Sequence, residues 1–205
     1  MSGLSRRSFT RGVLGAGIGL TLEACGSGAH SGPRPSPYSG DLRTVALAAA
    51  LENQAVSAYQ AVQAALHAGR FGPAVPALTA FVRAAVAHHT QHADTWNAIL
   101  REAREPVVTG APLSGHAQLM RAIKAASNLD AVVAAVQHLE NQAAQTYTAA
   151  AGSLASGGTA LTAAATIAPV EAMHAAALGS ALGRPSGVLG LLGATEAVPA
   201  TELTV

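Results

Sequence analysis

Two pairs of residues in this chain have the types and the spacing of metal ligands. His89 and His92 lie three positions apart, and so do Glu171 and His174. Residues three positions apart are neighbours on one face of an α-helix. Each pair can therefore direct two donor atoms into the same small volume, provided that both segments are helical.

Two further glutamates lie in a phrase that the chain repeats. Glu52 and Glu140 both stand in the sequence Leu-Glu-Asn-Gln-Ala, and Tyr59 and Tyr147 follow them by seven residues. Alanine, valine and leucine surround both glutamates at helical spacing, so each carboxylate falls on the apolar face of an amphipathic helix. A carboxylate in an apolar interior is costly unless it is hydrogen-bonded, ion-paired or bound to a metal. Both glutamates therefore need partners.

The donor types narrow the chemistry of such a site. Together the six residues offer three carboxylates and three imidazoles, which suit iron, manganese or zinc. Cys25 is the only cysteine, which excludes a disulfide framework and a thiolate metal site. The net charge is +1 and no basic run occurs beyond the N-terminal region, so nucleic acid is not an expected partner.

The elements that must position these residues are helices. Half of the residues are hydrophobic but only 3% are aromatic, and alanine accounts for much of the difference. Because alanine is the best helix former and lets helices approach closely, we predict an all-α protein. Pro169 lies inside the last long helix and is expected to kink it or to leave a carbonyl unpaired. The predicted long helices span residues 41–67, 76–104, 129–151 and 160–182, with a short helical piece at 116–126 inside the connection 106–128.

The same segments indicate an internal duplication. The two Leu-Glu-Asn-Gln-Ala phrases are 88 residues apart, and the two x-x-His pairs are 82 residues apart. Such similar offsets indicate a duplicated helical hairpin. Packing of the two hairpins about a pseudo-twofold axis would bring both glutamates and both pairs to the middle.

The order of these residues resembles a known family. A glutamate followed by a tyrosine, then an x-x-His pair, then the same order again across a long crossover, is similar to the ferritin-like superfamily, which includes ferritins, bacterioferritins and rubrerythrins. The resemblance covers residues 41–183 and implies a four-helix bundle around a carboxylate-bridged di-iron centre. It implies terminal carboxylates at Glu52 and Glu140, a bridging carboxylate at Glu171, imidazole ligands at His92 and His174, and tyrosines beside the centre at Tyr59 and Tyr147.

One position departs from the family pattern. His89 stands where the resemblance implies the second bridging glutamate. A neutral imidazole cannot bridge two cations as a carboxylate does, and the replacement removes one negative charge from the site. The expected consequence is an asymmetric pair of ions, a single ion, or a preference for a different metal. Classical ferroxidase behaviour is disfavoured, because the site has one negative charge fewer to compensate the extra positive charge of Fe(III).

These observations favour a protein that binds one or two transition-metal ions, iron first and manganese or zinc as alternatives. Its activity would be oxygen- or peroxide-linked redox chemistry, as a ferritin-like oxidoreductase, or metal handling. Two other interpretations stay open. The chain could be a metal-free scaffold or binding module at the cell surface, with Glu52 and Glu140 protonated or hydrogen-bonded to neighbouring amides. It could also hold a structural zinc ion. A homodimer is compatible with all three interpretations.

Several residues near the candidate ligands have simpler expected roles. His88 is expected to face solvent or to contact a ligand from outside, because adjacent helical residues point about 100° apart. Met173 and Trp96 are expected in the core. The remaining histidines lack a partner at helical spacing and are expected at the surface or in the N-terminal region: His30, His67, His116 and His138.

The first 25 residues have the pattern of an export signal. Arg6 and Arg7 precede a weakly apolar run over residues 12–22, which is shorter than the ~20 residues of a membrane-spanning helix. This pattern resembles a twin-arginine signal, which is read by the export machinery. Cys25 follows Leu-Glu-Ala and resembles a lipobox cysteine, although the glutamate departs from the small or apolar residue usual there. The resemblance implies lipidation of Cys25.

The resulting domain organisation has four parts. An export signal over 1–25 precedes a flexible, proline-rich tether over 26–40. The ferritin-like bundle occupies 41–183, and a tail over 184–205 is expected to run as a strap across it. The expected location is the cell envelope, with the domain lipid-anchored to the outer face of the cytoplasmic membrane.

Overall fold

The structure, a computed structural model, describes residues 36–73, 75–155, 158–184 and 193–205. These residues form helices and connections, and their only β-type pairing is an isolated bridge between Leu113 and Leu203. The all-α prediction is therefore confirmed. The helices are α1 (Asp41–His67), α2 (Pro76–Glu102), α3 (His116–Ala125), α4 (Leu129–Ser153), α5 (Gly158–Ala181) and the 3-10 helix η1 (Ala200–Glu202).

Local signals account for the helix ends. Pro76 occupies the first position of α2, where its missing N–H leaves no hydrogen bond unmade. The Asn128 side chain caps α4 by accepting a hydrogen bond from the Ala131 backbone N–H at 2.9 Å. We predicted that α2 reaches Arg104, but it ends at Glu102, and Arg104 adopts a left-handed φ of 62° that is incompatible with continuation.

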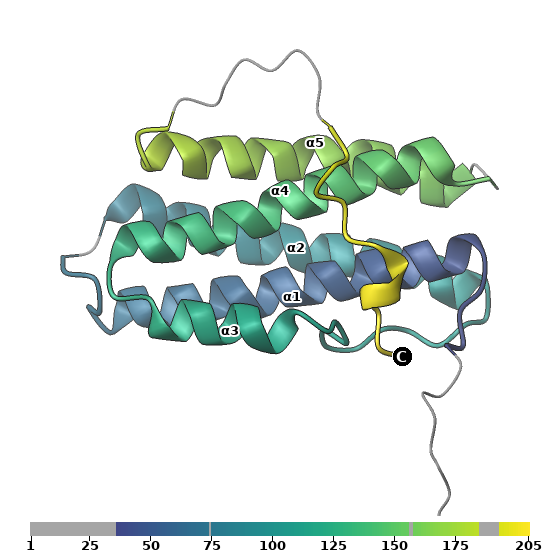
Figure 1. Ribbon diagram of the computed structural model, residues 1–205, viewed down its shortest axis with the longest axis horizontal. Coiled ribbons are helices and arrows are strands. Elements are labelled where there is room, and N and C mark those ends of the chain that lie inside the picture. The colour runs from purple at the N-terminus through teal and green to yellow at the C-terminus, as the bar shows by residue number, and fades with distance from the viewer. Residues whose placement is uncertain (1–35, 74, 156–157, 185–192) are drawn as a thin grey trace, which may run out of the picture. The chain divides into compact units, whose positions relative to one another are not determined.

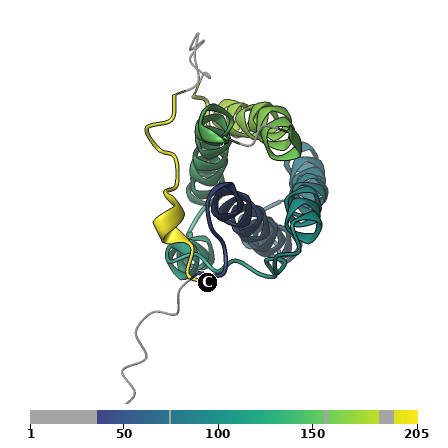
Figure 2. The ribbon, with the colours of Figure 1, turned by 90° about the vertical axis from the view of Figure 1, so that its right-hand side faces the viewer.

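The four long helices lie side by side around a common centre (Figures 1 and 2). The most extensive packing joins α1 to α2 and α4 to α5, while α1 also contacts α4 and α2 contacts α5. Helix α3 packs outside this group against α1 and α4. Helix α5 continues through Pro169, which cannot donate a backbone hydrogen bond to the preceding turn.

Two apolar clusters fill the space between the helices. One cluster contains residues 45–51 of α1 together with Trp96 and Tyr147, and the other contains Tyr59, Val82 and Leu178. Along each long helix, the candidate ligands fall between the two clusters. The charged side chains are therefore enclosed by apolar packing towards both ends of the helices.

The C-terminal residues 193–205 run across α4 to reach α1 (yellow in Figure 1). The Val198 N–H donates to Thr146 Oγ1 at 2.8 Å. Farther along, the Ser114 N–H donates to the Glu202 carbonyl at 3.0 Å, and the Thr204 N–H donates to the Pro112 carbonyl at 2.9 Å. We call residues 193–205 the C-terminal strap.

Helix α5 is the most apolar of the long helices. Among the described helices it alone is long and apolar enough to cross a membrane by length and composition, a test that the core helix of a globular domain also passes. Its contacts with α4 and α2 supply a reason for this composition. The expectation that Met173 is a core residue is wrong, because Met173 is 63% exposed on the outer face of α5.

Candidate metal centre

The structure brings all six predicted ligands together in the middle of the helices. Glu52 comes from α1, the two histidines at 89 and 92 from α2, Glu140 from α4, and the Glu171–His174 pair from α5. Five of the six are buried, and the side chain of His92 is 12% exposed. The helical spacing explains this convergence, because each pair lies on the face that its helix turns towards the others.

The six residues form two overlapping groups of donor atoms. One group contains Glu52, His89, His92 and Glu171, and the other contains His89, Glu140, Glu171 and His174. Within each group, one donor atom per residue lies within 4.8 Å of all the others. Oxygen and nitrogen ligands bind transition metals at about 2.0–2.2 Å, so donor atoms with this mutual spacing can surround one ion. Each group could therefore hold a metal ion.

His89 and Glu171 belong to both groups. His89 Nδ1 lies 2.7 Å from Glu52 Oε2, and its Nε2 lies 3.1 Å from Glu140 Oε1. The ring therefore spans the space between the two outer carboxylates, with one nitrogen directed to each group. Sequence spacing alone placed His89 in the site but could not show that its two nitrogens are divided in this way.

The other two histidines direct their Nδ1 atoms inward. His92 Nδ1 lies 2.7 Å from Glu171 Oε1 and 3.6 Å from Glu52 Oε2. His174 Nδ1 lies 3.2 Å from Glu171 Oε2 and 3.5 Å from Glu140 Oε1. Glu171 is thus the carboxylate that both histidines approach, which is the position expected of a shared ligand.

Several buried donor atoms have no hydrogen-bond partner among the described residues. They include Glu52 Oε1, Glu140 Oε2, Glu171 Oε1 and His92 Nδ1. His92 Nδ1 and Glu171 Oε1 are close enough to bond, but their alignment is not that of a hydrogen bond. Buried polar atoms are rarely left unbonded. Buried carboxylate oxygens that lack a hydrogen-bond donor, in a cluster that also offers imidazole nitrogens, fit a site for a cation, so the donor set fits a transition-metal ion.

The three glutamates differ in their electrostatic surroundings. Burial raises the pKa of Glu52, but the hydrogen bond with His89 and the positive charges of His89 and His92 outweigh burial and lower it. The pKa of Glu140 is lowered in the same way, mainly by His89. Burial and the negative charge of Glu52 instead raise the pKa of Glu171.

The pKa values of the three histidines are raised above that of a free imidazole, which favours their protonated forms in the absence of a metal. Burial lowers their pKa values, but the neighbouring carboxylates outweigh it. The pKa of His92 is raised to about 9, mainly by Glu171, and that of His174 to about 9, mainly by Glu140. The pKa of His89 is raised well above its ordinary value by Glu140 and Glu52. A metal ion that binds here must displace these protons.

The two predicted tyrosines lie against the cluster. The Tyr59 hydroxyl donates a hydrogen bond to Glu140 Oε1, and its ring stacks on His89 with centroids 5.4 Å apart. Tyr59, which follows Glu52 in the first repeat, therefore hydrogen-bonds to Glu140 of the second repeat. The Tyr147 hydroxyl donates to the Ala48 carbonyl at 3.4 Å. Burial, with the charge of Glu140 for Tyr59 and Glu52 for Tyr147, raises both phenol pKa values well above 10.

His88 contacts the cluster from the solvent side. Its ring is exposed and stacks on His174 with centroids 5.4 Å apart, and its Nδ1 lies 3.1 Å from His174 Nε2. This contact occupies the outer nitrogen of His174 and leaves Nδ1 directed inward. Phe81 packs edge-on against the same His174 ring at 5.6 Å. Phe81 was not among the predicted site residues, although helical spacing places it on the same stripe of α2 as His89 and His92.

A comparison with protein families identifies the domain. Residues 40–184 match the family model described as a ferritin-like domain. The chain belongs to this family. No curated protein and no solved structure matched the chain. The ferritin-like match spans all four helices that contribute to the cluster, and the cluster occupies the centre of that domain.

The remaining candidates lie apart from the cluster. His67 and His138 are exposed, and His116 is half-buried in α3. The Asn53 amide donates to the Val108 carbonyl at 3.0 Å, so it is engaged with the connection before α3 and not with Glu52. The predicted export-signal residues Arg6 and Arg7, the predicted lipidation site Cys25, and His30 lie outside the described residues.

Proposed function

We propose that this ferritin-like protein binds one or two transition-metal ions at its centre, with iron the first choice and manganese or zinc the alternatives. The observation that carries this proposal is the pair of overlapping donor groups, together with their buried, unbonded carboxylate oxygens. The finer architecture proposed with it is a four-helix bundle in which residues 106–128 form the crossover and α1–α2 and α4–α5 are duplicated hairpins.

Each residue of the cluster has a distinct role in this proposal. Glu52 and His92 would hold an ion on one side, Glu140 and His174 would hold an ion on the other, and Glu171 would be shared. A bound iron ion supplies a redox couple and a Lewis acid. The activity proposed is oxygen- or peroxide-linked redox chemistry or metal handling.

His89 makes the two halves of the site unequal. A neutral imidazole with one protonated nitrogen offers a single lone pair, so the ring can complete only one of the two groups at a time. The two groups consequently compete for His89, and one ion binds more tightly than the other. A site with carboxylates at both shared positions would not impose this competition.

A metal-free scaffold is the second candidate function, and one observation favours it. His89 already pairs with Glu52 at 2.7 Å and with Glu140 at 3.1 Å, so part of the buried negative charge is compensated without any ion. Under this alternative the ion pairs stabilise the helices and a surface of the domain binds another molecule.

The proposed location is the cell envelope. The twin-arginine pattern at Arg6 and Arg7 would direct export of the folded domain, and a lipid on Cys25 would anchor it to the outer face of the cytoplasmic membrane. Labelling with a radioactive fatty acid tests the anchor: wild-type protein is expected to take up the label and Cys25→Ser is not. Equal labelling of both would refute lipidation at Cys25.

Metal analysis separates the candidate functions. Purified full-length protein is loaded with Fe(II), Mn(II) or Zn(II) and dialysed, and bound metal is quantified for wild type, Glu52→Gln, Glu171→Gln and the exposed control Glu102→Gln. We expect both buried variants to lose metal and the control to retain it. Equal metal content in all four proteins would refute a metal site at the cluster. Retention of zinc alone, at one ion per chain, would favour a structural zinc site.

A further inference from the structure

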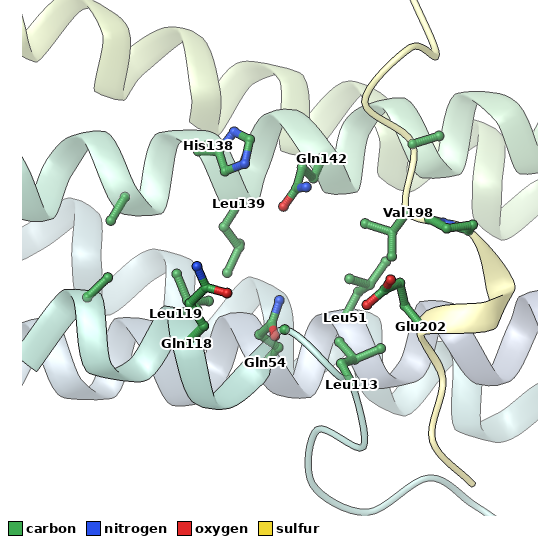
Figure 3. A pocket seen from close by; sticks show the side chains of 15 residues that line it. Leu51, Gln54, Leu113, Gln118, Leu119, His138, Leu139, Gln142, Val198 and Glu202 are labelled. Atoms are coloured by element: carbon green, nitrogen blue, oxygen red, sulfur yellow. The ribbon is translucent and has the colours of Figure 1, made fainter. Parts of the chain in front are cut away.

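A second site lies outside the metal centre, in a pocket between α1, α3, α4 and the C-terminal strap (Figure 3). Its volume is about 520 Å³, within the range of about 300–1,000 Å³ typical of small-molecule sites. None of the metal-centre residues lines it. The pocket therefore needs an explanation independent of the metal.

The walls of this pocket are mostly apolar. Leu51 and Leu139 come from the two repeated phrases, Leu113 and Leu119 come from the connection and α3, and Val198 comes from the C-terminal strap. A molecule with an apolar body would fill this space and exclude water from the leucine side chains.

One polar atom of a pocket residue lacks a hydrogen-bond partner among the described residues. Gln54 is only 8% exposed, and its buried Oε1 has no hydrogen-bond partner among the described residues. Neighbouring amides are bonded: Asn53 donates to Val108, and Gln145 Oε1 accepts from the Glu196 N–H at 2.8 Å. Because this oxygen is buried, a rotation of the terminal amide is required to present it to a ligand in the pocket. An unbonded buried amide is costly, and a ligand hydroxyl would satisfy it.

The internal repeat places a second amide opposite the first. Gln54 and Gln142 are the fourth residues of the two Leu-Glu-Asn-Gln-Ala phrases. Two positions before them, the glutamates of the same phrases turn to the metal centre. Figure 3 shows the two amides facing the same space from α1 and α4. The repeated phrase thus serves two sites, one on each face of its helix.

Charge restricts the ligand further. No lysine or arginine lines the pocket; its titratable side chains are Glu202, whose carboxylate accepts a hydrogen bond from the Ser114 hydroxyl, and the exposed His138. An anionic ligand would meet the Glu202 carboxylate with no lysine or arginine to compensate the two negative charges. The chemistry of the pocket therefore favours an uncharged molecule.

We propose that this pocket binds an uncharged small molecule with an apolar body and a hydroxyl group, and that the hydroxyl hydrogen-bonds to Gln54, with Gln142 as a second polar contact. The apolar body lies against the leucines of the two repeats and of α3. The C-terminal strap closes one side. This binding does not depend on whether a metal occupies the cluster.

Binding of matched probes to the full-length protein tests the proposal. The probe is 4-phenylphenol, and the comparison compounds are 4-methylbiphenyl, which lacks the hydroxyl, and biphenyl-4-carboxylate, which is anionic. Ligand-observed NMR and calorimetry give the affinities. We expect 4-phenylphenol to bind most tightly and the carboxylate least tightly. Failure of 4-phenylphenol to bind the wild type, including the case in which another part of the chain fills the pocket, would overturn the proposal.

Two variants locate the binding. Gln54→Met keeps the side-chain length but removes the amide, and should weaken 4-phenylphenol binding by about threefold to tenfold while leaving 4-methylbiphenyl unchanged. Gln60→Met, on the exposed face of the same helix, is the matched control. Leu119→Trp should abolish binding of all probes, because the indole ring fills the pocket. If Leu119→Trp fails to fold, Ala122→Leu is the substitute, because it fills the pocket with a smaller added side chain. Equal 4-phenylphenol affinity in Gln54→Met and Gln60→Met would refute the hydroxyl contact.

Discussion

Raising the pH from 6 to 10 is expected to destabilise the metal-free protein. His92 and His174 each have a pKa of about 9 in the folded chain, against about 6.5 when unfolded. A raised folded pKa contributes stability that is fully present below pH 6.5 and is lost as the pH rises through about 9. Since one pKa unit corresponds to about 1.4 kcal/mol, each histidine contributes roughly 3–4 kcal/mol at most. The two share Glu171, so their combined loss is less than twice that value.

Urea unfolding of the chelator-treated protein measures this loss. The free energy of unfolding is determined at half-unit steps from pH 6 to pH 10 at constant ionic strength. His92→Gln should reduce the pH-dependent loss without abolishing it, because the pKa values of His89 and His174 remain raised. His67→Gln, at an exposed position outside the cluster, is the matched control and should retain the wild-type profile.

Two results would refute the electrostatic argument. A wild-type profile that is flat between pH 6.5 and 9 would show that the histidines do not hold protons in the fold. An equal pH-dependent loss in wild type and His92→Gln would show that the loss comes from other groups. The lowered pKa of Glu52 acts in the opposite direction, because its contribution is lost as the pH falls below about 4.5.

Three other perturbations have defined outcomes. His89→Glu should convert one tight and one weak ion into two ions of similar affinity, as measured by metal titration; unchanged stoichiometry would count against the role of His89. Tyr59→Phe removes the buried hydrogen bond to Glu140 and should lower the free energy of unfolding by about 1–3 kcal/mol in urea. Trp96→Ala removes a fully buried ring that packs on Tyr147 at 5.5 Å, and should cost about 3–5 kcal/mol in the same assay; a loss below 1 kcal/mol would contradict tight packing there.

The helices and the cluster could be predicted from the sequence because two independent patterns agreed, the helical spacing of apolar residues and the internal repeat. Apolar residues at helical spacing placed Glu52 and Glu140 on inward faces, and the repeat placed His92 and His174 beside them. The bounds of α1 agree with the prediction, since Gly69 and the Gly72-Pro73 step follow its last residue directly.

Other features depend on how helices rotate and on distant segments, which spacing does not encode. Met173 follows the apolar pattern of α5 by composition, yet it points outward because its neighbours on the helix take the inward face. The bond from Tyr59 to Glu140 joins residues 81 positions apart across two helices. The pocket at Gln54 exists only because the C-terminal strap covers α1 and α4; we expected a strap across the bundle, but no local pattern places it over these two helices.

The substitution at position 89 also bears on how the chain assembles. The α1–α2 hairpin contributes one carboxylate and two imidazoles, whereas the α4–α5 hairpin contributes two carboxylates and one imidazole. With the imidazoles protonated, the first hairpin carries a formal charge of +1 at this surface and the second carries −1. A glutamate in place of His89 would give both hairpins the same negative sign, and their approach would require a cation. In this chain the opposite formal charges would favour association of the two hairpins before a metal is loaded.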